Sequence, residues 1–323
     1  MSSSALGSAK AVWDQRRGAR TTGDLAYVLY LAVMTIVVIG GPIARVAVQG
    51  LARPDVLPGL LSAAAPGMTT ALWLLICAGL VLLGRTRGPA VLSPFFAATL
   101  AWSAMPRRVA LTWPFLRGTA AVTAGFAVLC AVVGLTLETT GRVDLGAVAL
   151  FALAGSGAGM LAAACWLGGQ VLGGGSARIL AAVLVAGAVT ASLLAVPWGP
   201  GSAYPTLDTA VPWAFGLLGL GGIAVACSLP VLNRIRGQVL AEQARRWDEA
   251  TVSATTGDLA TAAAGYRALP TAGRRLPVVG SDLLVILYAR RDLLALLRTP
   301  ERSLVGAAGV LAAAFVLAQA MTL

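Results

Sequence analysis

The chain contains no histidine among its 323 residues. This absence excludes the commonest general base, the usual zinc ligand and any Ser-His-Asp arrangement. The only lysine is Lys10, which Ala11 follows, so the Gly-Lys-Ser/Thr core of a P-loop ATPase is missing as well. We therefore expect no catalytic residues, no metal ligands and no cofactor, and we do not expect the chain to be an enzyme.

Charged residues make up only 11% of the chain, whereas 58% of its residues are apolar. Several uncharged runs approach the roughly 20 residues that a helix needs to cross a hydrocarbon core of about 30 Å. The sequence therefore predicts an all-α fold, a polytopic transmembrane bundle of about seven helices with lipid as a partner. The abundance of Arg, Ala, Gly and Val suits a GC-rich genome, so we expect a multi-pass protein of a bacterial cell membrane.

Four segments follow from the order of apolar and polar stretches. A cytoplasmic interfacial segment (1–24) precedes a six-span domain (25–232), and a cytoplasmic helical segment (233–302) precedes a seventh span (303–323). The expected spans are 25–44, 68–84, 118–137, 145–167, 179–196, 214–232 and 304–323. None of them contains Asp, Glu, Lys or Arg, which ion-coupled transporters normally place at membrane depth. Any coupling to an energy source should then come from another chain.

The four cysteines each lie inside an apolar run and share no short spacing: Cys77, Cys130, Cys165 and Cys227. Metal-binding and redox motifs place cysteines only a few residues apart. We therefore expect four free, buried thiols rather than a disulfide or a metal site.

The stretch 85–117 carries the main ambiguity, because its middle (89–106) is itself mostly apolar. With a cytoplasmic N-terminus and no crossing there, 21 Lys and Arg residues lie inside and 3 outside. A crossing would put 17 outside, or 7 with the N-terminus also outside, so the positive-inside rule favours the non-crossing arrangement. Pro89, Pro94 and Pro106 agree, because proline interrupts the hydrogen-bond ladder of a spanning helix. We predict an in-plane cytoplasmic element, with a re-entrant one as the alternative.

The same count bears on the formal charge of +11, which in a soluble domain would suggest nucleic acid. Here the basic residues lie at span ends and in loops on one side, so membrane topology accounts for them. Nucleic acid is not an expected partner.

Glycines at helical spacing indicate where neighbouring spans pack closely. The fourth span contains Gly155-Ser-Gly-Ala-Gly159, and the sixth contains Gly219 and Gly222. Small residues at such spacing let two helix backbones approach each other. We therefore predict Gly155, Gly159, Gly219 and Gly222 at helix-packing faces.

Three patterns concern the ends of spans. The Gly-Gly-Pro sequence at 40–42 is expected to kink or end the first span near the outer surface. The loop 197–213 carries two tryptophans and Tyr204 in the manner of an interfacial aromatic belt, and the lining of a substrate exit is the alternative. The sixth span is expected to continue as a helix into the cytoplasm through Arg246.

Two motifs resemble the permease subunits of type-2 ABC exporters, particularly large actinobacterial ones. One comprises Gly88-Pro89, Ser93-Pro94, Trp102 and Ser103-Ala-Met-Pro106-Arg107-Arg108, followed by a mostly apolar stretch at 109–117 that ends in an arginine. The other is RDLLALLRTP at 291–300, which is similar to the helix that opens the second half of such permeases. Most of that second half is absent from the sequence, so the chain resembles a permease truncated after the start of its second half.

This resemblance implies that the loop 85–117 holds a coupling helix, through which a separate ATP-binding cassette subunit moves the spans. A second permease chain, in a homo- or hetero-oligomer, would be a further partner. The residues implied are Pro106, Arg107 and Arg108 for the coupling contact, and Arg291, Asp292 and Arg298 for a second interfacial helix.

A different class of function stays open at this point. A non-transporting assembly or accessory protein that binds a partner through 233–302 would need neither a second half nor polar residues in a cavity. Both absences favour it. The sequence indicates neither a substrate nor a direction of transport.

Overall fold

The computed structural model of the chain describes residues 22–101, 106–195 and 197–255, and the structural statements below concern these residues. The chain divides into two units, 1–262 and 263–323, and every described residue belongs to the first. Residues 1–21 of the expected interfacial segment lie outside the described residues. The same holds for Arg291, Asp292, Arg298 and the seventh span.

Every element in the described ranges is a helix, and none is a strand. The α-helices are α2 (Thr22–Thr35), α3 (Gly41–Leu51), α4 (Leu57–Leu61), α5 (Ala65–Thr86), α6 (Pro94–Ala101), α7 (Arg107–Glu138), α8 (Leu145–Val171), α9 (Gly174–Leu194), α10 (Ala210–Val231) and α11 (Gly237–Thr255). A π-helix, η1 (Ile36–Gly40), and two 3-10 helices, η2 (Gly199–Ala203) and η3 (Leu232–Arg234), lie between them.

Six candidate spans in these ranges are long and apolar enough to cross a membrane: Val33–Leu51, Ala65–Thr86, Arg107–Glu138, Leu145–Val171, Gly174–Leu194 and Ala210–Arg234. The prediction of an all-α transmembrane helical bundle is confirmed. The largest extension concerns the third span, which begins at Arg107 rather than at 118 and contains Pro114. Membrane helices tolerate such a proline where neighbouring groups satisfy the freed carbonyl.

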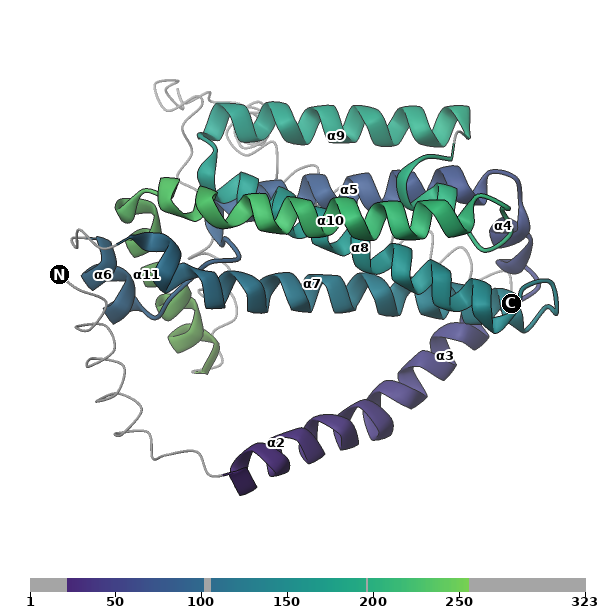
Figure 1. Cartoon of the computed structure of the whole chain (residues 1–323), viewed down its shortest axis with the longest axis horizontal. Coiled ribbons are helices and arrows are strands. Elements are labelled where there is room, and N and C mark those ends of the chain that lie inside the picture. The colour runs from purple at the N-terminus through teal and green to yellow at the C-terminus, as the bar shows by residue number, and fades with distance from the viewer. Residues whose placement is uncertain (1–21, 102–105, 196, 256–323) are drawn as a thin grey trace, which may run out of the picture. The chain divides into compact units, whose positions relative to one another are not determined.

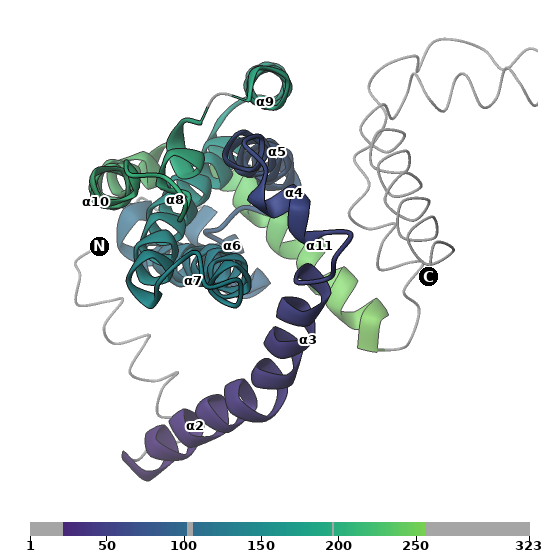
Figure 2. The same cartoon turned by 90° about the vertical axis from the view of Figure 1, so that its right-hand side faces the viewer.

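Helix α8 lies at the centre of the bundle and packs against α5, α7 and α10, while α9 packs on the outer side of α5 (Figure 2). Glycines on three faces of α8 make these close contacts possible. A Cβ added at Gly155 would lie 2.8 Å from the Phe126 carbonyl oxygen of α7, and one at Gly157 would lie 2.4 Å from the Leu217 carbonyl carbon of α10. One at Gly169 would lie 2.0 Å from an α5 carbonyl oxygen. Because no side chain intervenes, the backbones touch.

The glycines expected at packing faces divide into two groups. Gly159 lies against the Thr123 Cα of α7, 2.7 Å from the position of an added Cβ, and Gly155 makes a similar contact with α7. An added Cβ at Gly219 or Gly222 would meet no described atom within 4 Å. Gly221 makes the contact between α10 and α8 instead. All sides of α10 are apolar in sequence, so the spacing of its glycines did not indicate which side faces α8.

The first span differs from the expectation in its position. The chain stays helical through the Gly-Gly-Pro sequence at 40–42, because η1 leads into α3 and Pro42 lies in the first turn of α3, where its missing N–H costs nothing. The helix continues to Leu51, and the exposed Arg45 therefore lies within the candidate span Val33–Leu51. The candidate spans are longer than the expected ones and therefore include charged residues, such as Arg45 here and Arg117 in Arg107–Glu138, that lie outside the expected ranges 25–44 and 118–137. Helix α3 buries none of its residues and approaches the bundle mainly at α7 (Figure 1).

The loop expected as an aromatic belt is folded into the bundle only in part, because Trp198 and Trp213 are 42% and 39% exposed, as a belt requires, whereas Tyr204 is not. Gly199 to Tyr204 are all buried, and Tyr204 is only 1% exposed. The Tyr204 hydroxyl donates to the Leu60 carbonyl oxygen at 2.8 Å, and its ring meets Phe151 edge-on, with 5.5 Å between centroids. Tyr204 is therefore a core residue, because its hydroxyl finds a carbonyl inside the protein rather than at the lipid interface.

Replacing Tyr204 by phenylalanine is expected to lower the free energy of unfolding by about 1–2 kcal/mol, because the half-buried Leu60 carbonyl loses its donor. The measurement is thermal unfolding in detergent. Tyr27→Phe is the control, since Tyr27 is 61% exposed and should leave the unfolding temperature unchanged. Equal effects of the two substitutions would contradict the burial of this hydroxyl.

The same side chain predicts a pH dependence. Burial raises the pKa of Tyr204 to about 12, above the value of about 10 for an unfolded tyrosine. The stabilisation of the neutral hydroxyl is complete below pH of about 10 and is lost as the pH rises toward about 12. Tyr204→Phe should lack this part of the alkaline destabilisation, which parallel unfolding curves over that pH range would measure.

Candidate functional site

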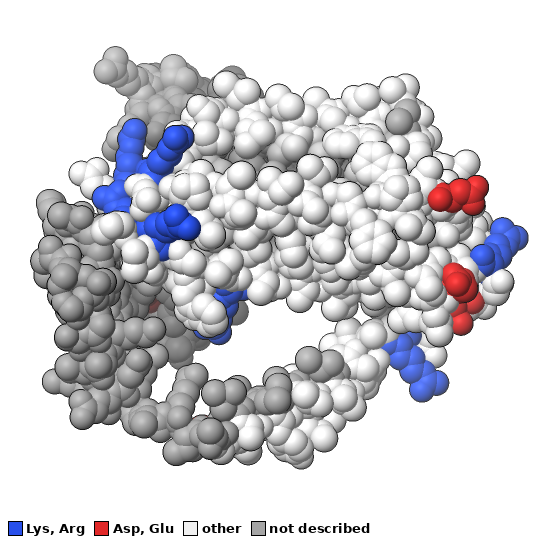
Figure 3. Space-filling view, in the orientation of Figure 1, with Lys and Arg blue, Asp and Glu red and all other residues white. Residues whose placement is uncertain are grey.

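Arginines gather at one end of the bundle, which we call the arginine-rich end. It is formed where α5 ends, α7 begins, the α8–α9 turn lies and α10 leads into α11. Figure 3 shows a group of basic side chains at this end of the visible face, and acidic and basic side chains together at the opposite end. The arginines at these helix ends and connections are Arg85, Arg87, Arg107, Arg108, Arg178, Arg234, Arg236, Arg245 and Arg246.

The segment between α5 and α7 stays at the arginine-rich end. Helices α5 and α7 run in opposite directions, so the segment leaves and re-enters the bundle at the same end, and it does not carry the chain across (Figure 1). Its helix α6 has 8 residues, far fewer than the roughly 20 that a span requires. Gly88, Pro89 and Ala90 are buried, so the segment begins by packing against the spans rather than extending into solvent.

Two buried glutamines fasten this segment to the bundle. Gln170, near the end of α8, is 4% exposed and Gln243 of α11 is 3% exposed. The Gln170 Nε2 donates to the Gln243 Oε1 at 2.8 Å and to the Ala90 carbonyl oxygen at 3.2 Å. The Gln243 Nε2 donates to the carbonyl oxygens of Gly84 and Arg85 at 3.0 and 3.2 Å. We call this arrangement the glutamine clamp.

The clamp requires a glycine beside it. A Cβ added at Gly88 would lie 2.0 Å from the Gln170 Cδ, so the amide occupies the space that any other residue at this position would fill. The carbonyls that the two amides bind include those of the last turn of α5, which have no partner within the helix. The clamp thus caps α5 and holds the following loop with the same side chains.

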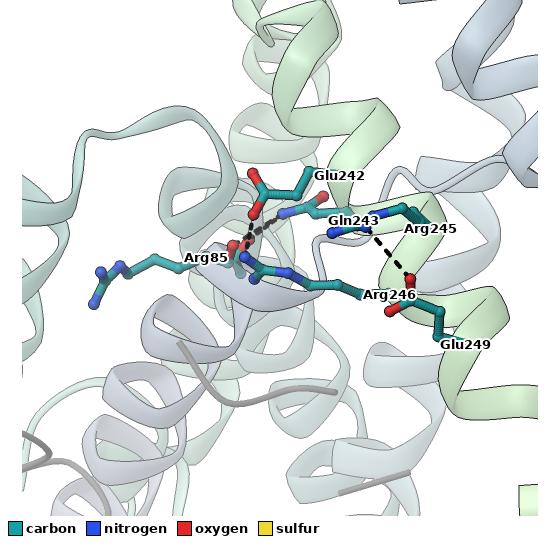
Figure 4. Close-up of polar contacts among 7 residues, drawn as sticks. Arg85, Glu242, Gln243, Arg245, Arg246 and Glu249 are labelled. Carbon is teal, nitrogen blue, oxygen red and sulfur yellow. Dashed lines mark hydrogen bonds and ion pairs between the residues drawn. The ribbon is translucent and has the colours of Figure 1, made fainter. Parts of the chain in front are cut away.

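Helix α11 adds contacts of its own along the loop. Figure 4 shows the Gln243 amide directed at the end of α5, with ion pairs from Arg246 to Glu242 and from Arg245 to Glu249 along the helix. The Arg87 guanidinium carbon lies 3.7 Å from the centroid of the Trp247 ring, within the range of a cation–π contact.

The structure corrects the expectation that the sixth span continues directly into the cytoplasmic helix. Helix α10 ends at Val231, η3 follows, and Ile235 has an extended backbone before α11 begins at Gly237. This break turns the chain, and α11 lies against α6 rather than extending away from the bundle. The turn is what brings Gln243 to the end of α5.

The three residues expected at a coupling contact take different positions. Pro106 is exposed and directly precedes α7. The Arg107 guanidinium donates to the Ile235 carbonyl oxygen, so this side chain is engaged within the bundle. The Arg108 backbone N–H donates to the Asn233 Oδ1 at 2.9 Å, and the residue is exposed. Of the two arginines, Arg108 therefore presents its side chain outward.

An apolar cluster supports these polar contacts from the membrane side. It joins α6, α7, α8, η3 and α11, so the loop, three spans and helix α11 share one packed interior at the arginine-rich end. Burying a large apolar side chain such as Leu111 or Phe115 contributes about 1.5–3 kcal/mol. The buried members are Ala90, Leu100, Leu111, Phe115, Leu167, Leu232, Ile235 and Leu240.

The arrangement connects several elements through hydrogen bonds. Within the described ranges no group of three or more His, Cys, Asp or Glu residues could hold a metal ion. The buried polar groups of the clamp satisfy one another, so they are not positioned to bind a substrate. What they do is join the ends of α5, α8 and α11 to the loop.

The sequence did not indicate Gln170, Gln243 or Asn233 as site residues. The two glutamines lie 73 residues apart and belong to no motif. The available signal was Gln170 itself, a polar residue at the end of an otherwise apolar run. Comparison of the sequence with protein-family models gave no match, and neither did searches of curated proteins and of solved structures.

Proposed function

We propose that the chain is the membrane-spanning permease subunit of an ABC-type exporter in a bacterial cell membrane, with ATP hydrolysed by a separate subunit. The observation that supports this best is the loop between α5 and α7. It contains the short helix α6, stays at the arginine-rich end and is fastened to several spans at once by the glutamine clamp and by Arg107. A partner that pushes on this loop would therefore move the spans.

The contacts suggest how such a push would spread. The Ala90 carbonyl is held by Gln170 of α8, and the Gly84 carbonyl at the end of α5 is held by Gln243 of α11. Asn233 and Arg107 tie α7 to the segment after α10. Displacement of the loop would therefore move α5, α7, α8 and the connection between α10 and α11 together.

The start of α7 offers a surface on which the partner would bind. Arg108 is exposed there, and Val109 and Trp113 are 63% and 74% exposed. Tryptophan and arginine are enriched among the residues that carry most of the binding energy of protein interfaces. We place the ATP-binding subunit at this surface.

A second function is favoured by the outward side of α11. Arg245, Asp248 and Glu249 are exposed there, and charges of both signs suit a polar interface with a soluble protein. A non-transporting assembly or accessory protein would bind its partner through this helix and would not need a loop that transmits force.

Photo-crosslinking from the α7 surface separates the two proposals. A photoreactive amino acid at Arg108 should capture an ATP-binding subunit in native membranes, whereas the same amino acid at Arg142, at the opposite end, should not. Capture of an ATPase from Asp248 on α11 but not from Arg108 would favour the accessory function.

A further inference from the structure

Two of the four cysteines lie on helices that pack against each other. Cys77 of α5 and Cys165 of α8 are neighbours in this packing. Cys77 is only 1% exposed. Cys165 packs against the apolar cluster that contains Ala78, which directly follows Cys77, and Val81, which lies one helical turn after it. The expectation of four free, buried thiols is wrong in one respect: all four cysteines are free, but Cys165 is half-buried and Cys227 is exposed. Helix packing also brings together two cysteines, Cys77 and Cys165, that are far apart in sequence.

The helices that carry them touch through their backbones one turn further along. A Cβ added at Gly169 would lie 2.0 Å from the Val81 carbonyl oxygen. Both α5 and α8 run toward the arginine-rich end (Figure 1), so the steps from Cys77 to Val81 and from Cys165 to Gly169 are the same turn along two parallel helices. A disulfide needs Cα atoms about 4.4–6.8 Å apart, a separation that helices in backbone contact provide.

We propose that Cys77 and Cys165 form an oxidisable dithiol, a modification site at which a disulfide-bearing oxidant joins α5 to α8. The Cys165 thiolate attacks the sulfur–sulfur bond of the oxidant, which releases one small thiol and leaves a mixed disulfide on Cys165. The Cys77 sulfur then attacks the Cys165 Sγ and expels the second small thiol. Each cysteine loses one proton, and the two electrons that the protein gives up reduce the oxidant.

The order of attack follows from exposure. Cys165 is partly exposed and meets the oxidant first, whereas Cys77 is buried and resolves the mixed disulfide from inside. The product closes a bond about two helical turns from Gly84, where the glutamine clamp holds α5. Oxidation would therefore prevent α5 and α8 from sliding past each other beneath the clamp. This chemistry does not depend on the transport proposal.

The test uses two variants of the full chain that each keep one pair of cysteines. Cys130→Ser/Cys227→Ser retains the proposed pair. Cys77→Ser/Cys165→Ser retains Cys130, which lies against Gly155 of α8, and Cys227, which faces outward from α10. Both are treated in detergent with dithiodipyridine, a lipid-soluble disulfide, and analysed for released thiopyridone and for intact mass.

The variant with Cys77 and Cys165 should release two thiopyridones per chain and retain none, and digestion should yield a peptide pair linked through these two residues. Cys77→Ser in the same background should release one and retain one on Cys165. The variant with Cys130 and Cys227 should retain an adduct on each cysteine that reacts. A stable thiopyridyl adduct on Cys165 while Cys77 is present and reduced would overturn the proposal, as would a linked peptide pair from the Cys130 and Cys227 variant.

Discussion

Replacing Gly169 by alanine is expected to lower the free energy of unfolding by about 3 kcal/mol, the upper part of the range for overpacked cores. The added Cβ would lie 2.0 Å from the Val81 carbonyl oxygen and 2.7 Å from the carbonyl carbon. Because the obstacle is backbone rather than a flexible side chain, α5 and α8 must separate along the contact. The reciprocal contact, from Gly84 to the Trp166 carbonyl oxygen at 2.3 Å, would be lost with it.

Gly168 provides a matched control one residue away. A Cβ there would meet nothing within 4 Å, so Gly168→Ala should leave packing intact and stabilise the helix by up to about 1 kcal/mol. Unfolding in detergent, by heat or by denaturing detergent, compares the two variants with the wild type. Similar stabilities for Gly168→Ala and Gly169→Ala would contradict the close contact between α5 and α8.

Replacing Gln243 by alanine is expected to cost about 3 kcal/mol and to release α11 from the loop. The substitution leaves the carbonyls of Gly84 and Arg85 without their donor and takes one partner from Gln170. Each buried polar group left unpaired costs about 1–3 kcal/mol. Hydrogen exchange of α11 amides should rise, and the unfolding temperature should fall.

Gln238 is the control for this second prediction, because it lies on the same helix and is exposed. Gln238→Ala should change neither hydrogen exchange across α11 nor the unfolding temperature by a measurable amount. A Gln243→Ala variant that kept α11 protected would show that the apolar cluster alone holds this helix in place.

The sequence predicted the spans well because their signal is local. An uncharged apolar run of sufficient length must be helical in a membrane, since every backbone group has to be satisfied within the segment. The prediction that the chain does not cross the membrane between the second and third spans also used local signals, because the prolines and the distribution of arginines are read directly from positions in the sequence.

The remaining features depend on contacts between residues far apart in sequence. Tyr204 looked like an interfacial anchor because nothing nearby indicates the Leu60 carbonyl that its hydroxyl binds. The glutamine clamp joins α8 to α11, and only the break at Ile235 makes this contact possible. Gly221 rather than Gly219 faces α8, and an all-apolar helix has no periodicity that would indicate this.

The central claim is that an ATP-binding subunit contacts the arginine-rich end through the loop between α5 and α7 and the start of α7. Its most direct test is affinity purification of the full chain from native membranes in mild detergent, with identification of co-purifying proteins and an assay of ATPase activity. Arg108→Glu is the informative variant, because the Arg107 side chain is engaged with Ile235 inside the bundle.

An ATP-binding subunit with ATPase activity should accompany the wild type and the control Arg142→Glu, and should be lost from Arg108→Glu while that variant still inserts and unfolds at the wild-type temperature. Recovery of the wild type without any ATPase, under conditions that preserve other membrane complexes, would contradict the permease proposal. So would an Arg108→Glu variant that keeps the ATPase at the wild-type level.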